Sequence, residues 1–255
     1  MHTAGLLLYL STVASATPLL RSEGVASLAD GTPAYREVHW RRGEPEGAAR
    51  WVQYLCPDGR PFARKELPGT AQPQARGYLL QDGRSGQAAR VVVAGGKVNI
   101  DWKESAPDAE RRAQVPLPAD AVIDTGFDAA VRAHWPALMK GDEVRLPFLV
   151  PGRQRFYPVS VRRTGALTWQ GAPAQAIEVR LATWYGAVAP RLSLVYADDD
   201  RRLLEFRGTS NLRDGHGAYP AVIVRFASPA TTQPQAQWQQ AWAQPLVASC
   251  GVSSR

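Results

Sequence analysis

The stretch Ala89-Arg-Val-Val-Val-Ala-Gly-Gly-Lys-Val-Asn-Ile-Asp-Trp102 decides the fold class of this 255-residue chain. Gly95-Gly96 has the composition of a two-residue hairpin turn, because glycine readily adopts the positive φ that such turns require. In the second arm, polar and apolar residues alternate from Lys97 to Trp102, so that one face is buried and the other faces water. The stretch therefore predicts an antiparallel hairpin that is buried on one side only.

Similar strand-like runs recur on both sides of this hairpin. Turn signals such as Pro57-Asp58-Gly59 separate them at intervals of about 8–15 residues. This rhythm is typical of an antiparallel meander. Residues 103–120 are charged and contain proline, and we expect them to form a connector. The predicted strands occupy residues 34–40, 50–56, 60–67, 78–80, 144–150, 155–163, 175–184, 192–196, 202–208 and 221–226.

One segment of the main body has helical periodicity. Asp124 or Thr125 is a suitable N-cap and Gly141 a suitable end, while Pro136 should kink the helix or split it in two. We therefore expect a mainly β protein, a curved antiparallel sheet or incomplete barrel wrapped on one helix at about residues 124–140. The apolar residues at helical spacing are Phe127, Val131, Trp135 and Leu138.

The first sixteen residues have the features of a secretory signal peptide. An apolar run ends in Ala14-Ser15-Ala16, the small-x-small pattern of a cleavage site, and the run is too short to span a bilayer. We expect an exported, periplasmic protein with no membrane span in the mature chain. The predicted organisation is a signal peptide (1–16), a polar lead-in (17–31), one β-rich domain (32–228) and a Gln/Ala-rich tail (229–255) that is either a short helix or disordered.

The chain is basic, with a formal net charge of +7, and 45% of its residues are hydrophobic. That content supports a packed core and argues against disorder. The arginines are scattered as adjacent pairs, and neighbours on a strand point to opposite faces, so no long basic patch is expected. Nucleic acid is therefore a poor candidate partner. The anions that an exported basic protein could meet are lipid, lipopolysaccharide or acidic glycan of the envelope, but the arginine pairs are more typical of a solvated face than of an anion site.

The chain has two cysteines, Cys56 and Cys250. In an oxidising compartment, two thiols are natural disulfide partners, and this bridge would tie the C-terminal tail to the early sheet. The alternative is a buried Cys56 and a free Cys250. The sequence does not decide between them.

The most polar cluster lies at residues 208–217 and contains Ser210, Asp214 and His216. These are the residue types of an acyl-transfer triad, but the serine lacks a Gly-x-Ser-x-Gly elbow, and three residues of one loop rarely converge on one site. A set of turns is the favoured interpretation. The histidines lack the spacing of metal ligands. We predict no catalytic residue, no metal site and no cofactor.

Eight tryptophans are many for this length. They indicate either a core of large side chains or a cavity lined by indoles, which would suit an apolar or glycan ligand. The candidate lining residues are Trp40, Trp102, Phe127, Val131, Trp135, Leu138 and Trp184.

Four segments resemble blocks of an uncharacterised family of exported proteobacterial proteins. They are Tyr35-Arg-Glu-Val-His-Trp40, Tyr54-Leu-Cys-Pro-Asp-Gly-Arg-Pro-Phe-Ala-Arg-Lys65, Val122-Ile-Asp-Thr-Gly-Phe-Asp128 and Arg202-Leu-Leu-Glu-Phe-Arg-Gly-Thr-Ser-Asn-Leu-Arg-Asp214. The order of elements is also similar to the lipoprotein-carrier (LolA/LolB-like) architecture. That resemblance implies an incomplete barrel that curls around a helix and encloses an apolar cavity for acyl chains.

These observations favour a periplasmic, non-enzymatic protein that binds a lipid, a lipoprotein or another hydrophobic molecule between sheet and helix. Two alternatives remain open. One is an envelope hydrolase that uses the 208–217 loop, and the other is a structural module that binds a partner through an open sheet edge. A hollow interior would favour binding, whereas a filled interior would leave only surface roles.

Overall fold

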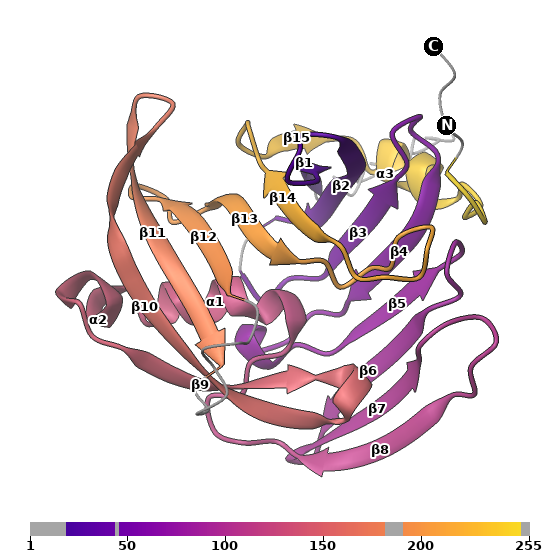
Figure 1. Ribbon diagram of the computed structural model, residues 1–255, viewed down its shortest axis with the longest axis horizontal. Coiled ribbons are helices and arrows are strands. Elements are labelled where there is room, and N and C mark those ends of the chain that lie inside the picture. Colours follow the sequence, from indigo (N-terminus) through magenta and orange to yellow (C-terminus); the bar gives the residue numbers. More distant parts are fainter. Residues whose placement is uncertain (1–18, 44–45, 182–190, 251–255) are drawn as a thin grey trace, which may run out of the picture.

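The computed structural model describes residues 19–43, 46–181 and 191–250. Fifteen strands of this part of the chain form one sheet, and every neighbouring pair of strands is antiparallel. The order across the sheet is β8-β7-β6-β5-β4-β3-β2-β1-β14-β13-β12-β11-β10-β9, with β15 paired to β1. The sheet curls strongly and stays open (Figure 1). This confirms the predicted fold class, a curved β-sheet of incomplete-barrel type.

The strands of the first half of the chain are β1 (Leu19–Ser27), β2 (Pro33–Arg42), β3 (Arg50–Leu55), β4 (Pro61–Leu67), β5 (Tyr78–Asp82), β6 (Ala88–Ala94), β7 (Lys97–Lys103) and β8 (Arg111–Pro116). Those of the second half are β9 (Val144–Val150), β10 (Arg155–Trp169), β11 (Ala172–Leu181), β12 (Leu192–Ala197), β13 (Leu203–Thr209), β14 (Ala221–Arg225) and β15 (Thr231–Gln233). The helices are α1 (Phe127–Ala133), α2 (Trp135–Lys140) and α3 (Gln235–Trp242), and the short 3-10 helices are η1 (Pro73–Ala75), η2 (Asp124–Gly126) and η3 (Pro151–Arg153).

The glycine turn joins β6 to β7 as predicted. Gly95 and Gly96 have φ angles of 56° and 72°, and Ala94 pairs with Lys97 across the turn. Positive φ at both central positions is the requirement of the tight hairpin turn, and glycine meets it without steric cost. The alternating residues of β7 then point in opposite directions, with Val98, Ile100 and Trp102 in the core.

The predicted helix is present but divided. Helix α1 ends and α2 begins on either side of His134, whose φ and ψ of −95° and 9° break the helical run two residues before Pro136. Gly141, with a φ of 93°, ends α2. The apolar side of both helices packs on β9–β12 in a cluster that includes Val131, Trp135, Leu138, Ile177 and Tyr196. The sheet therefore wraps around α1, as Figure 1 shows.

Three segments that were expected to lie outside the sheet contain strands, namely β1, β8 and, in the C-terminal tail, β15. The polar lead-in of residues 17–31 contains β1, which pairs with β2 on one side and with β14 and β15 on the other. The polar side chains of β1 predicted a segment exposed to water. In the structure Arg21 instead lies over the ring of Trp40 and pairs with Glu23. Gly24 of β1 lets the ring of Phe226 pack close to the strand, since a Cβ there would lie 2.7 Å from that ring. Backbone pairing on both sides outweighs side-chain polarity here.

The connector expected at residues 103–120 contains β8, one edge of the sheet. Its charges fit an edge strand, because charged side chains discourage pairing with a further chain. At the other end of the sheet, Val122 forms an isolated bridge with Phe148 and covers β9. Beyond it, η3 lies against β7, so that the two ends of the curled sheet approach each other.

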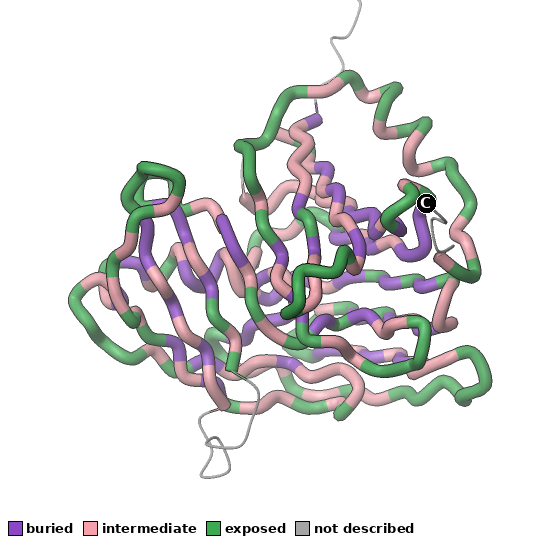
Figure 2. Tube along the Cα trace, turned by 45° about the horizontal axis from the view of Figure 1, so that its top comes forward, coloured by how far each residue is buried: buried purple, intermediate pink, exposed green. Residues whose placement is uncertain are grey.

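The C-terminal tail is a strap on the outside of the sheet. Strand β15 pairs with β1, and α3 packs Trp238 against Trp51 with ring centroids 4.8 Å apart. The structure joins Cys250 to Cys56 by a disulfide, with 5.3 Å between the two Cα atoms. In Figure 2 the buried residues follow the central strands, while the long loops are exposed.

Candidate functional site

A hollow of about 500 Å³ lies inside the curl of the sheet. Its volume falls in the range of small-molecule sites, roughly 300–1,000 Å³. The deepest lining residues are buried and mostly apolar: Tyr78, Leu80, Gln87, Trp102, Leu149 and Ser210. The outer lining residues are more exposed and mostly polar: Glu104, Arg111, Arg153 and Tyr219. The hollow is therefore apolar at depth and polar at its rim.

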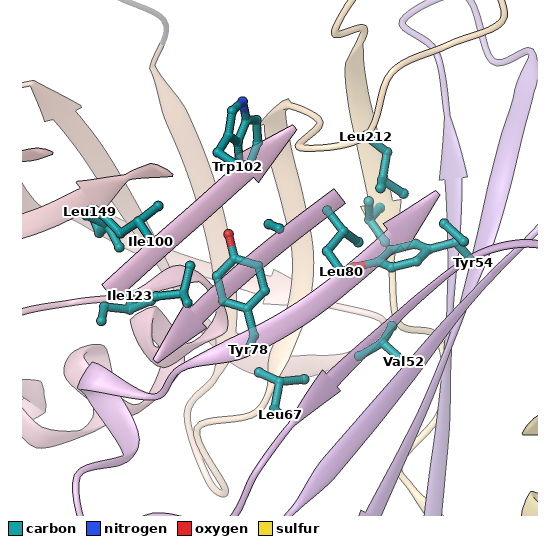
Figure 3. Close-up of a cluster of buried hydrophobic side chains, with 14 of the residues drawn as sticks. Val52, Tyr54, Leu67, Tyr78, Leu80, Ile100, Trp102, Ile123, Leu149 and Leu212 are labelled. Atoms are coloured by element: carbon teal, nitrogen blue, oxygen red, sulfur yellow. The ribbon is translucent and has the colours of Figure 1, made fainter. Parts of the chain in front are cut away.

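Strand register builds the floor of this hollow. Leu80 pairs with Ala89, Ala89 with Trp102, and Trp102 with Arg111. Residues paired across antiparallel strands project from the same face of the sheet, so this row runs from the buried floor to the exposed rim. Figure 3 shows Leu80, Tyr78 and Trp102 within the same buried cluster as Leu149.

The turn η3, at the tip of the β9–β10 hairpin, forms one wall. Gly152 lies so close to the indole of Trp102 that an added Cβ would be 3.3 Å from its nearest ring atom. A side chain at this position would force the turn or the indole to move. Leu149 and Phe148 extend the same wall toward the buried end.

The connection between β13 and β14, residues 210–220, forms the opposite wall. Gln87 donates a hydrogen bond from Nε2 to the carbonyl oxygen of Asn211, at 3.1 Å. Arg84 also donates to the carbonyl oxygen of Arg213. Gln87 itself is buried, and its Oε1 has no hydrogen-bond partner among the described residues. The Oε1 of Gln87 is therefore a hydrogen-bond acceptor in the lining of the hollow to which no described residue donates.

A buried ion pair closes the end of the hollow next to the helix. The Nζ of Lys65 donates to both carboxylate oxygens of Asp124 at 2.8 Å, although Lys65 is only 1% exposed. Asn211 donates to the same carboxylate at 3.2 Å, and the ammonium group lies 5.2 Å from the ring centre of Tyr78. Burial, with the nearby Asp124 charge, raises the pKa of Tyr78 well above its ordinary value, so this phenol stays protonated.

Glu104 organises the rim. Its carboxylate accepts hydrogen bonds from the Trp102 indole at 2.8 Å, and from Tyr219 and Arg213 at 2.6 Å each. Partial burial alone would raise the pKa of this carboxyl, but these three donors outweigh burial and lower the pKa to about 2. Glu104 is therefore ionised at neutral pH and neutralised by its own partners. Arg111 lies farther from it, at 3.6 Å.

Of the predicted lining residues that the structure describes, Trp102 alone lines the hollow. Val131, Trp135 and Leu138 pack between the helices and β9–β12, with Phe127 at the edge of the same cluster. The space between sheet and helix is thus filled by side chains, and the hollow lies beside the start of the helix instead. Trp40 packs on the strap side of the sheet, away from the hollow. Trp184 lies outside the described residues.

The loop at residues 208–217 does not assemble a triad. Ser210 Oγ lies 3.2 Å from the Tyr35 hydroxyl and accepts a bond from the Leu212 amide. Asp214 Oδ1 accepts bonds from the backbone amides of His216 and Ala218. Since a triad requires the base to reach the nucleophile, this arrangement supports the turn interpretation and removes the basis of the hydrolase alternative.

Most residues of the hollow were not predicted from the sequence, although the position of Lys65 carried a signal for the buried ion pair. Lys65 occupies a core-facing position of its strand, between Ala63 and Leu67, and an unpaired lysine there would be costly. A lysine at such a position predicts a buried acidic partner, here Asp124. Arg153 and Tyr219 carried no comparable signal, because loops bring them to the rim.

Comparison with known proteins shows the fold and no family. No family model and no curated protein matches the sequence, so the resemblance to an exported proteobacterial family stays a prediction. The chain is similar to a solved β-barrel-like protein of the domain of unknown function DUF1849 from Brucella abortus, at a TM-score of 0.51 and 8% identity over 86% of this chain and 98% of that one. A putative outer membrane lipoprotein-sorting protein domain from Vibrio parahaemolyticus gives a TM-score of 0.27 and 7% identity over 85% of each chain. The first likeness defines the fold, and the second is too distant to add to it.

Proposed function

We propose that this protein is an exported, non-enzymatic binding protein of the periplasm that holds a hydrophobic or amphiphilic molecule, such as a lipid or the lipid part of a lipoprotein, in the hollow. The observation that carries the proposal is the hollow itself, about 500 Å³ with an apolar floor and a polar rim. Sites for small molecules are typically concave and apolar, with a few placed polar groups.

Two observations support export. Residues 1–16 have the features of a signal peptide, although they lie outside the described residues. The disulfide between Cys56 and Cys250 fits an oxidising compartment. Among the described residues, no helix combines the length and the apolar character that crossing a membrane requires.

The test is binding of N-phenyl-1-naphthylamine, a neutral dye that fluoresces in apolar surroundings. We expect saturable binding to the wild-type protein and weaker binding to Leu80→Trp, because Leu80 lines the floor and the larger indole would protrude into the hollow. Leu79→Trp is the matched control, since Leu79 is the next residue on β5 and is 40% exposed on the other face.

Both variants are first checked for folding by thermal unfolding. Equal dye binding by the two folded variants, or no binding by the wild type, would refute the proposal. A native ligand that stays bound during purification would compete with the dye. The protein is therefore refolded from denaturant before the measurement.

A further inference from the structure

The charges around the hollow are not balanced. Two carboxylates line it, and each already has a cation: Asp124 pairs with buried Lys65, and Glu104 binds Arg213 at 2.6 Å. The rim carries two further cations, Arg111 and Arg153. The side chain of Arg111 is 50% exposed and lies 3.6 Å from Glu104. No hydrogen bond or ion pair joins the Arg153 guanidinium to the residues that the structure describes.

Both arginines are directed to the hollow by the fold. Arg111 is the cross-strand partner of Trp102 and therefore projects from the concave face. Arg153 ends η3, the turn that covers the Trp102 indole through Gly152. Arg112, the neighbour of Arg111, projects from the opposite face, where it pairs with Glu110.

We infer that the ligand is an alkyl-chain amphiphile with a small anionic head group, a carboxylate or a phosphate, whose chain lies on the apolar floor and whose head is held by Arg111 and Arg153. This inference rests on the proposed function and adds the class of ligand. Arginine suits this role because its planar guanidinium forms paired hydrogen bonds with carboxylate and phosphate oxygens. The position of the arginines at the rim leaves the head group partly in water, so its charge is not fully desolvated. Burial of the alkyl chain on the floor is favourable, because it removes apolar surface from water.

The experiment measures displacement of the same dye by ligands with one ten-carbon chain and different heads: decanoate, decyl phosphate, decanol and decyltrimethylammonium. For the wild-type protein we expect one of the two anions to bind about tenfold or more tightly than decanol, as charge-assisted hydrogen bonds imply. Whichever anion binds more tightly identifies the head group. Added salt should reduce this preference, because the rim charges are exposed.

The double variant Arg111→Gln/Arg153→Gln should lose the preference for anions and keep the affinity for decanol. Arg112→Gln is the matched control, and it should keep the preference. Equal affinity of the wild type for decanol and both anions, tighter binding of the cation, or an unchanged preference in the double variant would overturn the inference while the proposed function stands. Absence of dye binding and of all four ligands would instead refute the proposed function.

Discussion

At the scale of single residues, the most unusual group is Lys65. Its ammonium group is removed from water and held by both oxygens of Asp124. Removing one member of a buried ion pair leaves the other charge without compensation, which typically costs about 3–5 kcal/mol. We expect Lys65→Met to lower the free energy of unfolding by about 3 kcal/mol, measured by urea denaturation.

The double variant Lys65→Met/Asp124→Asn should recover part of this loss, because no charge then remains unpaired. Lys97→Met, at an exposed position of the β6–β7 turn, is the control and should change little. If Lys65→Met were no more harmful than Lys97→Met, the pair would have no structural role.

Glu104 should make the stability of the folded protein depend on pH in the acidic range. Folding lowers its pKa from 4.5 to about 2, so the folded state favours the ionised form more than the unfolded state does. The resulting stabilisation is complete above pH 4.5 and is lost as the pH falls toward 2, where the folded protein also takes up the proton. Wild-type protein and Glu104→Gln should therefore differ most in melting temperature above pH 5, and the difference should shrink on acidification. A constant difference between pH 7 and pH 3 would contradict this assignment.

The site illustrates what single residues reveal from sequence alone. Trp102 was predicted because it belongs to a clear alternating strand, and that strand fixes its face. The four helical candidates, from Phe127 to Leu138, obeyed an equally clear period, but periodicity shows only that a side chain is buried, not whether it faces protein or empty space. Arg153 and Tyr219 reach the rim from turns, and turns have no period to follow.

At the scale of elements, the start of α1 is fixed by contact with η1. The amide of Ile123 donates to the carbonyl oxygen of Gln74 at 2.9 Å, and a Cβ on Gly126 would lie 2.1 Å from the same oxygen. Glycine is needed here for close approach, since its φ of −62° is an ordinary helical value.

Gly126→Ala should therefore lower the free energy of unfolding by about 2 kcal/mol through overpacking, although alanine is the better helix former. The comparison is Gly165→Ala on β10, where a Cβ would have no neighbour within 4 Å and little change is expected. Urea denaturation of both variants measures the difference. A stabilised Gly126→Ala would show that η1 and α1 are less tightly docked than described.

At the scale of the whole molecule, the turns of the meander were predictable because glycine, proline and aspartate mark them in the sequence. The strands missed were β1, β8 and the short β15, and the reasons differ for the two longer ones. Strand β1 is polar because its side chains pair with one another and with Arg36, and β8 is polar because it is an edge. The closure of the curled sheet depends on contacts between residues that are far apart in the chain, such as Val122 and Phe148. Local sequence patterns contain no signal for such contacts.

The two ends of the sheet differ in a way that hydrogen exchange detects. Within the part of the chain that the structure describes, strand β8 is paired only with β7, which leaves its outer edge without a neighbouring strand. At the opposite end, the amide of Leu149 donates to the carbonyl oxygen of Val122 at 2.9 Å, and the amide of Val122 donates to Pro147 at 2.8 Å. Amides exchange through local opening, which is easiest where neighbours are fewest.

We therefore expect peptides from β8 to exchange more than about tenfold faster than peptides from β9, and those from central β3 to exchange slowest. Exchange followed by mass spectrometry measures this order. Strand β9 also leads directly into η3, which lies over Trp102 and forms one wall of the hollow. Fast exchange at β9, equal to that at β8, would mean that this end opens freely, and the hollow would then have no fixed wall.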